Sequence, residues 1–157
     1  MPFPISAAQP MKPPSAATSS IARDVVIASD PAEARRLQEE IEQHLQVHRV
    51  SERDAFSIRL ALEEALVNAI KHGNQLDRSK KVAISYRVQT DRFEITITDE
   101  GTGFDPADVP DPTAVENLER PCGRGLMLMR HYMNEVQYST RGNSVFMAKA
   151  FRANGKK

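Results

Sequence analysis

Apolar residues recur every three or four positions over two stretches of the N-terminal half, and this period predicts two helices. The run Ser29-Asp30-Pro31 supplies an N-cap and a proline at the first helical position, so the first helix should run from there to about His48. Its buried face should comprise Ala34, Leu37, Ile41 and Leu45. The second helix should begin at Ser51 and end at Gly73, with the glycine as a C-cap. It is apolar around much of its circumference, so we expect it to be largely buried.

Other segments alternate apolar and polar residues with a period of two, which is typical of strands with one buried face. The expected strands are 24–28, 82–88, 93–98, 136–140 and 144–151. A third helix should run from about Gly125 to Asn134 and pack Met127, Met129 and Met133 into the core. The resulting order, β-α-α-β-β-loop-α-β-β, predicts an α+β fold. We expect a two-layer α/β sandwich with helices on one face of a mixed, mostly antiparallel sheet.

Proline placement divides the chain. Residues 1–20 contain five of its ten prolines, interspersed with Ser and Ala, and are expected to form a disordered tail. One domain should then occupy 21–152, with a short C-terminal tail at 153–157. Within the domain, residues 104–122 are expected to form a long loop that interrupts the regular structure. Loops of that length in compact domains are usually functional or disordered.

Composition narrows the functional classes. The chain has 21 basic residues (Lys and Arg) and 21 acidic residues (Asp and Glu). This balance of charge argues against a non-specific nucleic-acid binder. No apolar stretch approaches the roughly 18 residues of a membrane span, and the N-terminus lacks the features of a secretory signal. Cys122 is the only cysteine, which excludes an internal disulfide. The expected location is the cytoplasm.

Four residues of the second helix form the first candidate site. Glu64 and Asn68 lie four positions apart and share a helix face, which Lys71 and His72 extend. An Asn carbonyl oxygen can bind Mg²⁺ without neutralising the ion, and a carboxylate one turn earlier can accept a proton. Taken alone, the pattern fits the solvated edge of an amphipathic helix better.

Two glycine-rich segments supply further candidates. Asp99 follows directly on a strand, where it could accept a hydrogen bond from an exocyclic amine such as that of adenine. Gly101 and Gly103 would let the backbone approach a ligand closely. The run 123–126, Gly-Arg-Gly-Leu, opens a helix whose N-terminal N–H groups could face an anion. Alone, these segments fit an ordinary turn and a flexible helix start equally well or better.

The three motifs, in this order and at these separations, resemble the nucleotide-binding boxes of the GHKL ATPase superfamily. Residues 64–73, EALVNAIKHG, resemble its asparagine box, 99–104 its first glycine box, and 123–126 its second. Within that superfamily the chain is most similar to the bacterial anti-sigma-factor serine/threonine kinases. The resemblance covers about 21–152.

This resemblance implies a histidine-kinase-like ATPase fold that binds Mg²⁺ and ATP beneath a lid at about 104–122. Glu64 would be the general base, Asn68 the Mg²⁺ ligand and Asp99 the adenine reader. The resemblance implies further nucleotide contacts from Lys71, His72, Gly101, Gly103, Gly123, Arg124, Gly125 and Leu126. Either Arg120 or Arg124 would neutralise charge on the γ-phosphate, and the sequence does not choose between them.

The family also implies partners. The expected activity is phosphorylation of an anti-anti-sigma (STAS-type) protein on Ser or Thr, alternating with sequestration of a sigma factor or another regulated protein. An alternative is a non-catalytic ATP-binding module that sequesters a partner protein. A homodimer could form through the exposed edge of the strand near Val25. Direct contact with nucleic acid or membrane is not expected.

Overall fold

The computed structural model describes residues 20–101 and 121–151, without the side chains of 121–124. Its elements are β2 (Ile21–Ala28), α1 (Pro31–Val47), α2 (Glu52–Val67), the π-helical turn η2 (Asn68–Gly73), β3 (Lys81–Val88), β4 (Arg92–Thr98), α3 (Pro121–Tyr132), β5 (Glu135–Tyr138) and β6 (Ser144–Ala150). The predicted element order is confirmed. The expected tails and lid lie outside the described residues, apart from Ser20 and from 121–122, which open α3.

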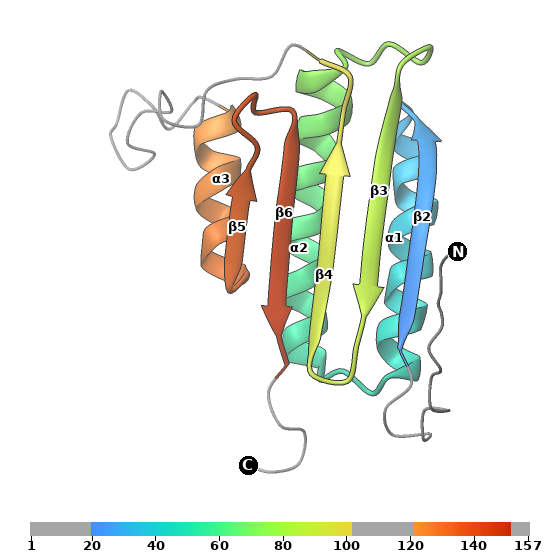
Figure 1. Cartoon of the computed structure of the whole chain (residues 1–157), viewed down its shortest axis with the longest axis vertical. Coiled ribbons are helices and arrows are strands. Elements are labelled where there is room, and N and C mark those ends of the chain that lie inside the picture. Colours follow the sequence, from blue (N-terminus) through green and yellow to red (C-terminus); the bar gives the residue numbers. More distant parts are fainter. Residues whose placement is uncertain (1–19, 102–120, 152–157) are drawn as a thin grey trace, which may run out of the picture.

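The described strands form one sheet in the order β2-β3-β4-β6-β5, and the helices lie against one of its faces (Figure 1). This confirms the predicted α+β sandwich. Every pairing among the described strands is antiparallel, so the sheet is less mixed than expected. The helix pair α1–α2 explains the pairing of β2 with β3, since two successive helices return the chain to the end at which β2 finished (Figure 1).

The core lies between the sheet and the helices. β3 buries every second residue, and β4 does the same, as their alternating patterns predict. The buried residues of α1 are the four expected ones, Ala34, Leu37, Ile41 and Leu45. Each fully buried Leu or Ile side chain contributes about 1.5–3 kcal/mol. Among the described helices, none combines the length and apolarity required to cross a bilayer.

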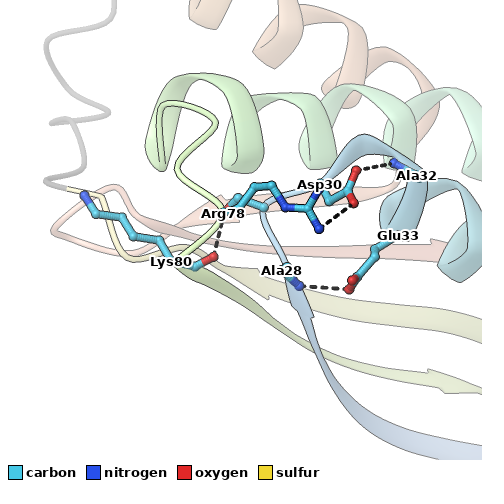
Figure 2. A network of polar contacts seen from close by, with 7 residues as sticks. Ala28, Asp30, Ala32, Glu33, Arg78 and Lys80 are labelled. Carbon is cyan, nitrogen blue, oxygen red and sulfur yellow. Dashed lines mark hydrogen bonds and ion pairs between the residues drawn. The ribbon is translucent and has the colours of Figure 1, made fainter.

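Side chains hold the start of α1 against the end of β2 (Figure 2). Asp30 accepts a hydrogen bond from the Ala32 N–H at 3.0 Å, the expected N-cap. Glu33 reaches back to the Ala28 N–H at 2.9 Å, and Arg78 forms an ion pair with Asp30 at 3.2 Å. The loop before β3 is thereby attached to the strand–helix junction.

The second helix differs from the prediction near its end. After α2 the backbone continues as a π-helical turn, in which the N–H of Asn74 donates to the carbonyl of Ala69 at 2.8 Å. Gly73 does not have the positive φ of a C-cap glycine, so that prediction is wrong. The left-handed conformations belong to 75–76, with φ of 54° and 60°. Gly73 instead allows the close approach of Asp99 that is described below.

The third helix begins at Pro121, four residues before the expected start at Gly125. Met129 and Met133 are buried, as their helical spacing predicts. Met127 is 39% exposed, and its predicted place in the core is wrong. Two residues advance a helix by about 200°, so a residue two positions from Met129 faces away from the core.

Candidate active site

A glycine brings α3 against the face of α2 that carries the first motif. A Cβ added at Gly125 would lie 3.0 Å from the Asn68 Nδ2 and 3.1 Å from the Glu64 Cγ. The backbone of α3 therefore contacts both side chains. The structure thus places Glu64 and Asn68 next to Gly125 of the second glycine motif.

The side-chain oxygen of Asn68 lies in a chemically unusual position. Its Oδ1 is buried and has no hydrogen-bond partner among the described residues. Leaving a buried polar oxygen unsatisfied costs about 1–3 kcal/mol. Glu64, one helical turn earlier, remains partly exposed. Together they present a neutral oxygen ligand and a carboxylate, a donor set that fits Mg²⁺ with its bound phosphates.

The π-helical turn leads from Asn68 to a second close contact, between Gly73 and Asp99. A Cβ added at Gly73 would lie 2.5 Å from the Asp99 Cγ, and one at Gly101 would lie 2.2 Å from the Gly73 carbonyl oxygen. Real Cβ atoms do not approach other atoms so closely, so an alanine at Gly101 would press on backbone and one at Gly73 would displace the Asp99 carboxylate. The first glycine motif therefore packs directly on the end of the asparagine-box helix. π-Helical turns are common at functional sites.

The Asp99 carboxylate is a hydrogen-bond acceptor in a half-buried setting. Its Oδ1 accepts from the Gly101 N–H at 2.7 Å. Burial raises the pKa of Asp99, while the Gly101 N–H and the positive charges of Arg141 and Lys80 oppose that rise. Such a carboxylate can accept a hydrogen bond from an amino group of a ligand.

Two asparagines hold the backbone around Asp99. The Oδ1 of Asn74 accepts from the Glu100 N–H at 2.8 Å. The carbonyl of Asn143 accepts from the Asp99 N–H at 2.9 Å, and its Nδ2 donates to the Asp99 carbonyl at 3.1 Å. Sequence reasoning missed both residues. Each follows a glycine in a segment that reads as turn chemistry, and no local signal distinguishes a turn asparagine from one that supports a site.

The remaining described candidates differ in their exposure to solvent. Lys71 is exposed and lines a groove between α1 and α2 of about 260 Å³. His72 is partly buried in the same π-helical turn. Leu126 is buried, at 4% exposure. Of these three, Leu126 follows directly on Gly125, whose backbone approaches Glu64 and Asn68.

The structure describes only the backbone of two further predicted residues, and two others lie outside the described ranges. The backbone of Gly123 and Arg124 belongs to the first turn of α3, which confirms that the second glycine motif stands at the start of a helix. Gly103 and Arg120 lie outside the described residues.

Comparison with known proteins agrees with this geometry. An anti-sigma F factor of Oceanobacillus iheyensis is 37% identical over 98 residues, which cover 59% of this chain and 66% of that protein. The serine/threonine-protein kinase BtrW of Bordetella bronchiseptica is 30% identical over 95 residues, with coverage of 59% and 67%. The serine-protein kinase RsbW of Listeria monocytogenes is 29% identical over 102 residues, with coverage of 59% and 63%.

The aligned segments thus span about two thirds of each relative. A family model, the histidine kinase-like ATPase domain, matches residues 27–149, which include all three motifs. The chain belongs to the histidine kinase-like ATPase domain family.

Proposed function

We propose that this chain is an ATP-dependent serine/threonine protein kinase and anti-sigma factor of a partner-switching system, and that it phosphorylates an anti-anti-sigma (STAS-type) protein. Relatives named anti-sigma F factor and serine-protein kinase support the proposal. So does the spatial convergence of the three motifs. The observation that carries it is the buried Oδ1 of Asn68, which has no hydrogen-bond partner among the described residues, on a side chain that packs with Glu64 against Gly125.

Asn68 would supply the protein ligand to Mg²⁺. The bound ion would neutralise phosphate charge and orient the γ-phosphoryl group. A neutral amide keeps the full charge of the ion available for the phosphates, whereas an aspartate would offset part of it. The contact with Gly125 holds the Asn68 side chain against α3, which fixes its orientation.

Glu64 would act as the general base. It would accept the proton of the attacking Ser or Thr hydroxyl as the new oxygen–phosphorus bond forms. The bond between the γ-phosphorus and the β–γ bridging oxygen breaks in the same transfer, and ADP leaves with that oxygen. Because Glu64 is partly exposed, a protein substrate can reach its carboxylate.

Asp99 would read the 6-amino group of adenine, with Gly101 and Gly103 beside the base. Residues 123–126, in the first two turns of α3, would lie beside the phosphates, near the positive end of the helix dipole. Lys71 and His72, close to Asn68 in sequence, would add contacts at the nucleotide. Arg120 or Arg124 would neutralise charge on the γ-phosphate, under a lid at 104–122.

The proposed partners follow from the same relationship. A sigma factor or another regulated protein would be the alternative binding partner. Because ATP is the phosphoryl donor, we expect the activity in the cytoplasm. A homodimer through β2 is compatible with the sheet order, in which β2 lies at one edge of the strands that the structure describes.

The test is direct phosphoryl transfer. The ATP-bound chain would be used to capture its partner, and the captured pair would then be incubated with γ-labelled ATP and Mg²⁺. We expect the label on a Ser or Thr of the partner, located by mapping of the phosphopeptide. ATP binding with no label on any captured partner would contradict the kinase assignment and would favour the non-catalytic binding module.

A further inference from the structure

The turn that carries Asp99 is held from two distant parts of the chain. Asn74 contacts it from the end of the π-helical turn, and Asn143 contacts it from the connection between β5 and β6. Together they make hydrogen bonds to the N–H and carbonyl of Asp99 and to the N–H of Glu100. The backbone is thereby fixed on both sides of the Asp99 side chain.

Asn74 is fully buried, at 0% exposure, and its amide is bonded at both ends. Its Oδ1 accepts from the Glu100 N–H at 2.8 Å, while its Nδ2 donates to the Ser29 Oγ at 2.7 Å and the Lys81 carbonyl at 3.0 Å. Opposite ends of the amide face a donor and two acceptors, so the side chain cannot flip without losing these bonds. A buried polar group held this way is costly to disturb.

Ser29 links Asn74 to the start of the helix layer. Its hydroxyl donates to the Lys80 carbonyl at 2.9 Å, close to the capping contacts drawn in Figure 2. Hydrogen bonds through Asn74 and Ser29 therefore fix the Asp99 turn relative to the junction of β2 with α1.

Asn143 completes the attachment from the other side. Its backbone carbonyl accepts from the Asp99 N–H at 2.9 Å, and its side-chain Nδ2 donates to the Asp99 backbone carbonyl at 3.1 Å. The two hydrogen bonds close a ring. The preceding residue, Gly142, has φ of 84°, a conformation that glycine adopts without strain and that shapes the turn presenting Asn143.

We propose that Asn74 and Asn143 are positioning residues that fix the Asp99 carboxylate and thereby set the preference of the site for adenine over purines without a 6-amino group. This inference rests on the proposed function, in which Asp99 reads adenine. A hydrogen bond discriminates between bases only if its acceptor is held within about 0.5 Å, and the two asparagines supply that constraint.

The test compares two nucleotides that differ only in the base. Dissociation constants of ADP and of inosine diphosphate are measured by calorimetry on the full chain, so that the phosphates contribute equally to both. We expect the wild-type chain to prefer ADP by about tenfold or more, the value of one hydrogen bond to a charged group. Asn74→Ala and Asn143→Ala should each lower that ratio severalfold.

One control variant separates the positioning role from a general loss of stability. Asn134→Ala removes an asparagine side chain that accepts from the Ala150 N–H at 2.7 Å, a bond outside the Asp99 turn. It should keep the wild-type ratio. If Asn74→Ala does not fold, Asn143→Ala decides the question, because its side chain is only partly buried.

The possible outcomes distinguish a failure of the positioning role from a failure of the proposed function. A wild-type preference for ADP that survives in the Asn143→Ala chain, and in any folded Asn74→Ala chain, would overturn the positioning role and leave the proposed function intact. A wild-type chain that binds both nucleotides equally would overturn the assignment of Asp99 and this inference with it.

Discussion

Three glycines determine how closely the motif-bearing segments approach, and they differ in what an added methyl group would meet. At Gly101 it would meet the backbone carbonyl of Gly73, at 2.2 Å. At Gly73 it would meet the Asp99 carboxylate, and at Gly125 the side chains of Asn68 and Glu64 at 3.0 Å or more. Backbone yields least and side-chain ends yield most, so the three positions should tolerate alanine to different degrees.

The first prediction compares Gly101→Ala with Gly125→Ala. Gly101→Ala should lower the free energy of unfolding by about 2–3 kcal/mol, because overpacking against backbone forces a segment to move. Gly125→Ala should change it by less than about 1 kcal/mol, since improved helix propensity offsets the tighter contact. Urea denaturation of both variants measures the difference. Equal losses would contradict the close packing of the Asp99 turn on Gly73.

The second prediction concerns Asp99 and pH. Burial raises its pKa in the folded chain, so the unfolded chain ionises first as the pH rises. The contribution of Asp99 to stability therefore falls between its ordinary pKa and its raised one, and the loss persists at neutral pH. Asp99→Asn should remove this fall while weakening ATP binding about tenfold or more.

Unfolding free energies of the wild-type and Asp99→Asn chains between pH 3 and pH 7 provide the measurement. We expect the Asn variant to gain stability relative to the wild type as the pH rises. A constant difference over this range would contradict the raised pKa of Asp99.

At the scale of elements, α3 has one buried face and one exposed face, although both carry methionine. Met129 has no exposed surface, whereas Met127 is 39% exposed. The third prediction is that Met129→Ala costs about 2–5 kcal/mol and Met127→Ala less than about 1 kcal/mol. The Met127 variant is the matched control, since it removes the same atoms from the same helix. Similar losses in urea denaturation would contradict the described orientation of α3.

The sequence predicted the elements well because most of them bury one face, and burial leaves a period of 3.6 or 2. The buried face of α1 and the alternation of β3 and β4 agree with that prediction. The π-helical turn at 68–73 was not predictable, because a π-turn differs from an α-turn by a hydrogen-bond register that leaves no periodic signature in so short a segment. The prediction for Met127 was wrong because it relied on the apolar side chain of methionine and not on the angular position of the residue around the helix.

The site was predictable only in part, for a related reason. Glu64, Asn68 and Asp99 were found because their residue types suggest chemistry and their motifs resemble a known family. Asn74 and Asn143 act on backbone groups remote in sequence, through contacts that only the folded chain brings together. Local pattern contains no information on such contacts.

At the scale of the whole molecule, one layer supplies the sheet and the other supplies the helices that bear Glu64 and Asn68 (Figure 1). The Asp99 turn follows β4 and packs on the end of the π-helical turn, so the candidate site combines residues from both layers. The helix layer would provide the base and the metal ligand, and the sheet layer would provide the group that reads adenine. Catalysis under this proposal depends on the two layers keeping their relative position.

The most direct test of the kinase proposal is Glu64→Gln, a change that preserves shape and removes the proton acceptor. Rates of label transfer from γ-labelled ATP to the captured partner would be compared for the wild-type and variant chains, together with their affinities for ATP. We predict that transfer falls about 100-fold or more while ATP affinity changes by less than about threefold. Transfer at the wild-type rate by a Glu64→Gln chain that binds ATP normally would contradict the assignment of Glu64 as the general base.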